Sequence, residues 1–95
     1  LAENGILVAV VVMEKETGRF VSGPDIVTRG FIYVRQSEVL LDETRKRAAA
    51  ELAEIEEKGI TEWSVIKSRL RNILTDYFYE ETARRPIVLP IIVEI

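Results

Sequence analysis

The sequence predicts an α+β fold with the element order ββααβ, in which two helices pack on one face of a sheet of about three strands. Two apolar runs of strand length stand near the two ends of the chain, at residues 6–13 and 87–95. Between residues 37 and 82, apolar side chains recur every three or four positions, which is typical of amphipathic helices. One two-layer domain spanning residues 1–95 is the simplest arrangement of these elements.

Two strands are predicted in the first third of the chain. Ile6–Met13 is a nearly continuous β-branched run, which indicates a strand buried on both faces or nearly so. A polar stretch ending near Gly18 follows, and the β pattern restarts at Phe20, so we expect an antiparallel hairpin. Residues 22–25 are rich in turn formers, so the second strand either stops or bulges there. Apolar residues at 31–34 follow as a further possible extended segment.

The first helix is predicted over residues 37–58. Ser37 is expected to be its N-cap, and Gly59 is expected to end it in the usual C-cap manner. The side chain of Arg45 falls in the apolar stripe, where its stem can lie along the core. The stripe consists of Leu41, Arg45, Ala48, Leu52 and Ile55.

The second helix is predicted to start after a Thr61 cap and to run to about Thr82. Its aromatic residues fit the core rather than a base-stacking platform, with Tyr79 alone expected to face outward. The apolar face consists of Trp63, Ile66, Leu70, Ile73, Leu74, Tyr77 and Phe78.

Residues 87–95 are predicted as a closing strand. Pro90 lacks a ladder donor, which indicates an edge strand or a bulge. Two helices cover only one face of a sheet whose first and last strands are apolar on both sides. Part of that apolar surface is therefore expected to meet a partner, the rest of a longer chain or another copy. The candidate self-association residues are Ile91, Ile92 and Val93.

The composition excludes several classes of function. The chain has 13 Lys+Arg, 16 Asp+Glu, and neither His nor Cys. Zinc sites, Ser-His-Asp or Cys-His catalysis and disulfides all need those two residue types, so no cofactor is expected in this chain. A net charge of −3 disfavours a protein that coats nucleic acid. The longest apolar run is far shorter than the roughly 20 residues of a membrane span, and the lack of Cys permits a cytoplasmic location.

Three clusters of polar residues each allow a bland and a functional interpretation. The segments 23–25 and 28–30 could form an anion-binding loop, or a bulged turn held by hydrogen bonds from Asp25 to nearby backbone amides. The absence of a phosphate-binding motif favours the bulged turn. Glutamates at 51, 54 and 57 could gather a cation, but no polar loop shapes a cage around them. Basic residues could contact RNA, although the glutamates among them favour a solvated, salt-bridged surface. The candidate RNA contacts are Arg29, Arg35, Lys67, Arg71, Arg84 and Arg85.

Long segments of the chain resemble the C-terminal domain of ribonuclease J. They are residues 20–34, 63–67 and 79–92, with the sequences FVSGPDIVTRGFIYV, WSVIK and YEETARRPIVLPII. The resemblance implies a parent enzyme of the metallo-β-lactamase class with a β-CASP insertion, a zinc-dependent 5′ exonuclease and endonuclease in RNA processing and degradation. The zinc-ligating motifs of that family are absent from this sequence, so no catalytic residue carries over. In that family the C-terminal domain is a small sheet with two helices that contributes to oligomer assembly and full activity.

The resulting hypothesis is a noncatalytic accessory and oligomerisation domain of a cytoplasmic ribonuclease J-like enzyme. Its expected partners are a second copy and the catalytic core of the same polypeptide, with RNA reached through the parent enzyme and no membrane contact. The alternative is an RNA-contacting module that positions substrate for the catalytic core.

Overall fold

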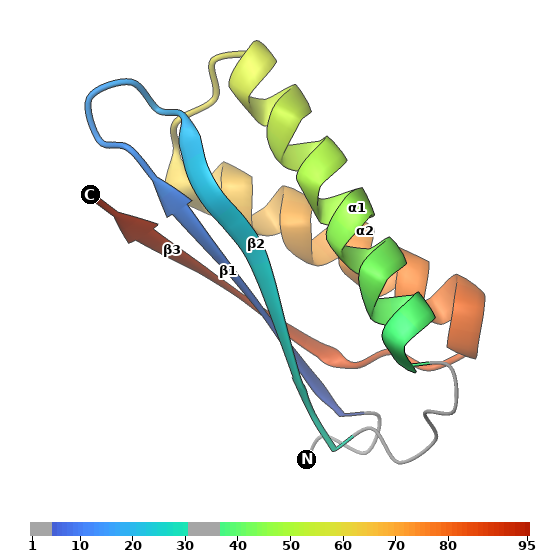
Figure 1. Cartoon of the computed structure of the whole chain (residues 1–95). Coiled ribbons are helices and arrows are strands. Elements are labelled where there is room, and N and C mark those ends of the chain that lie inside the picture. Colours follow the sequence, from blue (N-terminus) through green and yellow to red (C-terminus); the bar gives the residue numbers. More distant parts are fainter. Residues whose placement is uncertain (1–4, 31–36) are drawn as a thin grey trace.

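The computed structural model describes residues 5–30 and 37–95. Its elements follow the predicted order ββααβ, and the two helices lie together on one face of a three-stranded sheet (Figure 1). The predicted α+β class is therefore confirmed. The apolar segment 31–34 and the candidate Arg35 lie outside the described residues. The elements are β1 (Ile6–Met13), β2 (Phe20–Arg29), α1 (Ser37–Glu57), α2 (Trp63–Thr82) and β3 (Ile87–Glu94).

The sheet is mixed and has the strand order β2-β1-β3. The central strand β1 is antiparallel to β2 and parallel to β3, so Ile6 lies beside both Arg29 and Ile87. The N–H groups of Ile87 and Ile95 donate to carbonyl oxygens on the β1 side. Since N–H directions alternate along a strand, the nitrogen of Pro90 points to the free edge. The predicted edge position of Pro90 is thus confirmed, and this proline interrupts the row of donors that the edge offers to another strand.

A bulge in β2 keeps the strand continuous through its turn-forming residues. The pairing shifts register between Val10 and Val12 of β1, opposite the segment that contains Gly23. Gly23 has a φ of 101°, and a Cβ placed there would lie 2.8 Å from the carbonyl oxygen of Val10. Only glycine fits both requirements. Beyond the bulge the ladder resumes with Asp25 opposite Val10.

The core lies between the sheet and the helices, with α1 over β2 and α2 over β3. Alternate residues of β1 face the helices and are almost fully buried, because successive side chains of a strand point to opposite faces. The outward residues of β1 are only half-buried, so the expectation of a strand buried on both faces holds for one face alone. The inward set is Leu7, Ala9, Val11 and Met13, packed against Ala48, Leu52, Ile55, Ile66, Leu70, Leu74, Phe78, Val88 and Ile92.

Two members of the predicted helical stripes are exposed. Trp63 is 41% exposed, because it occupies the first position of α2, before the helix passes over the core. Arg45 also faces solvent, where it pairs with Asp42 at 2.9 Å. Thr44 takes the core position instead, and its hydroxyl donates to the Leu40 carbonyl at 2.7 Å, so burial leaves it satisfied.

The helix boundaries differ slightly from the predictions. The N-cap of α2 is Glu62, with no side-chain cap hydrogen bond, and Thr61 lies one residue outside it. The first helix ends at Glu57, one residue before the predicted position, and Gly59 follows with a φ of 68°. That positive φ is the left-handed conformation by which glycine commonly ends a helix.

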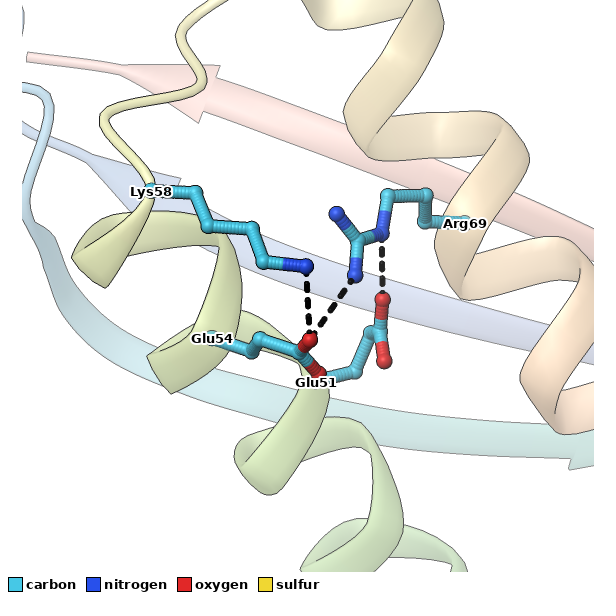
Figure 2. A network of polar contacts seen from close by, with 4 residues as sticks. All are labelled: Glu51, Glu54, Lys58 and Arg69. Atoms are coloured by element: carbon cyan, nitrogen blue, oxygen red, sulfur yellow. Dashed lines mark hydrogen bonds and ion pairs between the residues drawn. The ribbon is translucent and has the colours of Figure 1, made fainter.

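An ion-pair network joins the two helices on their outer side (Figure 2). The guanidinium Nε of Arg69 in α2 donates to Oε2 of Glu51 in α1 at 2.6 Å. Its Nη2 lies 3.6 Å from Oε1 of Glu54, which Lys58 also contacts at 2.8 Å. The hydrogen bond and charge of Lys58, with a contribution from Arg69, lower the pKa of the Glu54 carboxyl. Glu51 is nearly buried, so Arg69 supplies the countercharge that its burial requires.

Replacing Arg69 should therefore destabilise the domain more than replacing a comparable exposed arginine. We expect Arg69→Met to lower the free energy of unfolding by about 1–3 kcal/mol, because the Glu51 carboxylate loses its partner. Arg71→Met is the matched control: Arg71 is exposed on the same helix and forms no ion pair within the described residues. The control should change stability by less than about 0.5 kcal/mol. Equal losses in urea unfolding would contradict the role assigned to Arg69.

Candidate interaction surface

Both helices lie on one side of the sheet, so the other side is free of them (Figure 1). The outward side chains of β1 and β3 make this side an apolar surface, here called the open face. The ladder register places the outward residues of the three strands side by side. Those of β1 are half-buried, and those of β3 are 43–46% exposed. No element in the described part of the chain packs on this side. The open face consists of Ile6, Val8, Val10 and Val12 of β1, Val27 of β2, and Ile87, Leu89, Ile91 and Val93 of β3.

Only two of the three predicted self-association residues belong to the open face. Ile91 and Val93 point outward, at 44% and 43% exposure. Ile92 lies between them, points into the core and is 7% exposed, so it is not available to a partner. The β1 residues of this surface are not among the predicted self-association residues. The alternation of side chains along a strand is the signal that separates Ile92 from its neighbours.

The β2 side of the open face carries one acidic and one basic residue. Asp25 pairs with Val10 and Arg29 pairs with Ile6, so both share the outward side with those residues. The less favoured alternative, an anion-binding loop, is not formed, because Asp25 and Arg29 lie within the continuous strand β2. The favoured alternative, a bulge, is present opposite Val11. The Asp25 side chain does not hold this bulge by a hydrogen bond among the described residues. Arg29 makes one long hydrogen bond, from Nη1 to the Thr28 carbonyl at 3.3 Å.

The basic residues proposed as RNA contacts do not form one patch. Arg29 lies at the end of the sheet where Ile87 begins β3, and Arg84 and Arg85 come just before Ile87. Lys67, by contrast, lies about 22 Å before the end of α2, given a rise of about 1.5 Å per residue. Arg71 is one helical turn further along α2.

Lys67 and Arg85 each lie against an aromatic ring. The Arg85 guanidinium lies 4.3 Å from the centre of the Tyr79 ring, and the Lys67 ammonium lies 5.7 Å from that of Trp63. Tyr79 is 47% exposed, which confirms its predicted outward position.

The donor set of this chain does not fit the zinc ions that the family resemblance implies for a parent enzyme. The sequence contains neither His nor Cys. Glu51 and Glu54 are held by Arg69 and Lys58, and across residues 5–30 and 37–95 no three acidic side chains converge as a metal site would need. Within the same residues, neither helix is long and apolar enough to cross a membrane.

Comparison with known proteins gives a match over the full chain. The family model for the ribonuclease J C-terminal domain matches residues 1–95. The chain is 40% identical over 95 residues to Ribonuclease J2 of Bacillus subtilis (strain 168). It is 44% identical over 97 residues to Ribonuclease J 2 of Staphylococcus saprophyticus and to that of Staphylococcus aureus (strain NCTC 8325 / PS 47).

In each of these relatives the match covers 100% of this chain but 17% of the relative. The chain thus corresponds to one domain of longer proteins. The two-layer ββααβ fold and the match over all 95 residues lead to the same conclusion: the chain belongs to the ribonuclease J C-terminal domain family.

Proposed function

We propose that this chain is a noncatalytic accessory domain through which a ribonuclease J-like enzyme self-associates, with the open face as the contact surface. The observation that carries the proposal is the uncovered apolar layer on β1 and β3, where Leu89 and Ile91 are 46% and 44% exposed. Contiguous exposed apolar surface of this kind marks interaction sites in proteins that are otherwise well packed.

The size of the open face supports a weak contact. A strand of eight residues is about 26 Å long, and three neighbouring strands are about 14 Å wide, so the open face measures roughly 26 Å by 14 Å. Each half-exposed aliphatic side chain contributes about 1 kcal/mol when a partner covers it. Five residues of the open face are 43–46% exposed, so two copies bring ten such side chains together. Their gain of about 10 kcal/mol is similar to the roughly 4–15 kcal/mol cost of association. The isolated domain should therefore associate weakly, and further contacts in a longer protein would strengthen the assembly.

The sheet edge is a poorer candidate for the contact than the sheet face. Strand addition needs an uninterrupted row of free N–H and C=O groups. Pro90 removes a donor in the middle of the free edge of β3. The face is therefore the surface through which we propose that copies meet.

The chemistry of RNA cleavage is proposed to reside outside this chain. The relatives are named ribonucleases, and this chain spans 17% of their length. The zinc ions that the family resemblance implies need His and Asp motifs that this sequence does not contain. In this proposal the domain provides the contact surface for self-association, and the remainder of the longer protein provides the metal ligands and the substrate contacts.

A second candidate function is contact with RNA. The observation that favours it is the gathering of Arg29, Arg84 and Arg85 at one end of the sheet. The net charge of −3 and the separation of Lys67 and Arg71 from this end weigh against it.

A charge on the open face should weaken self-association. Ile91→Lys places an ammonium in the middle of the apolar layer, where burial against a partner would desolvate it. In sedimentation equilibrium, the 95-residue chain should associate with rising concentration, and Ile91→Lys should weaken this by more than about tenfold. Val39→Lys is the matched control, because Val39 is 74% exposed on α1, away from the sheet, and this variant should associate like the unaltered chain.

A strictly monomeric chain from micromolar to millimolar concentration would overturn the self-association proposal. So would equal weakening by Ile91→Lys and Val39→Lys, since that result would point to charge alone and not to the open face.

The RNA candidate has its own test. If the basic end binds single-stranded RNA, fluorescence anisotropy should show an affinity that falls with salt, with a log–log slope of about −2 for three contacts. The double variant Arg84→Gln/Arg85→Gln should remove most of it, whereas Lys67→Gln/Arg71→Gln should not. Absence of binding at low salt would eliminate this candidate.

A further inference from the structure

We infer that, where two copies of this chain meet through the open face, a two-fold axis sets Asp25 of each copy against Arg29 of the other. The inference rests on the proposed function, since it assumes that the open face is a contact surface. It adds the symmetry of the contact and the two residues that fix the register.

Asp25 and Arg29 are arranged so that they cannot neutralise each other within one copy. They lie four residues apart on the same side of β2, a separation of about 13 Å along the strand. Neither forms an ion pair with any residue in the described part of the chain. Both are exposed at the rim of an apolar surface, where a partner would bring new charges close to them.

A two-fold axis that lies between the two open faces and runs perpendicular to the strands places both charges opposite charges of the other sign. Val27 lies midway between Asp25 and Arg29, level with Val8 and Leu89. An axis that passes through this row of residues places each residue opposite the residue that lies equally far on the other side of the row in the second copy. Asp25 then faces Arg29 of the other copy, and Arg29 faces Asp25, as an isologous contact requires.

The same axis matches apolar residues with apolar residues. The level of Asp25 contains Val10 and Ile91, and the level of Arg29 contains Ile6 and Ile87. Exchange of these two levels sets Val10 against Ile6 and Ile91 against Ile87 of the other copy. Sheets that pack face to face are about 10 Å apart, a gap that Asp and Arg side chains at the rim can bridge together.

Other face-to-face arrangements leave the charges unmatched. An axis along the strands puts β2 over β3 of the other copy, so that Asp25 faces Ile91 and Arg29 faces Ile87. Desolvating a charge against an aliphatic side chain is unfavourable. Shifting the axis across the strands by two residues sets Asp25 against Asp25 or Arg29 against Arg29. The two charges therefore select one register among those that the apolar layer alone would allow.

Two charge-reversal variants test the inference. Asp25→Arg makes both rim charges of a copy positive, and Arg29→Asp makes both negative. Each variant alone brings like charges together at two symmetric contacts, so we expect self-association at least about tenfold weaker than that of the unaltered chain. An equimolar mixture restores an opposite charge at both contacts and should associate within about threefold of the unaltered chain, as a one-to-one pair.

Sedimentation of the two variants, alone and mixed, is the measurement, with circular dichroism to verify that each variant folds. If a reversal unfolds the chain, the neutral variants Asp25→Asn and Arg29→Gln take its place, and the recovery is then sought in the double variant Asp25→Arg/Arg29→Asp. No recovery in a mixture of folded variants, while the unaltered chain associates, would overturn this inference and leave the proposed function standing. An unaltered chain that does not associate would overturn the proposed function itself.

Discussion

The arrangement of this domain depends on the alternation of side chains between the two faces of the central strand β1. Every second residue of β1 is buried under the helices, while the residues between them are aliphatic and only half-buried. The two helices pack on the same side of the sheet, joined there by Glu51 and Arg69. The core and the open face are thus two sides of the same strand, and a strand that stabilises one side necessarily presents the other. A domain built in this way is stable enough to fold and still has apolar surface left for a partner.

The strands and helices were predictable because their signals are local. Apolar runs, helical periodicity and prolines mark them without knowledge of the tertiary structure. The predictions were wrong where the burial of a side chain depends on how the helix packs against the sheet. Trp63 fits the helical stripe, but it stands at the start of α2, beyond the edge of the core. Thr44 occupies the buried position in place of Arg45, because the threonine hydroxyl forms its hydrogen bond within its own helix.

The open face was predictable in kind but not in its residues. An excess of apolar strand positions over the area that two helices can cover indicated an exposed sheet face, and the structure contains one. The set of residues on it depends on strand register. Regular alternation places Asp25 and Arg29 on the same side of β2. No pattern in the sequence fixes the pairing with Val10 and Ile6 that puts this side on the open face. The family comparison adds that the chain spans 17% of the length of the Bacillus subtilis relative.

The central claim is that copies meet through the open face, and amide NMR spectra recorded over a dilution series test it most directly. The account predicts concentration-dependent shifts at residues of β1 and β3, with Val8, Val10, Leu89 and Ile91 among the largest. Amides on the solvent side of α1, such as that of Lys46, should not move. Shifts confined to the helices, or spectra that are identical at all concentrations, would contradict it.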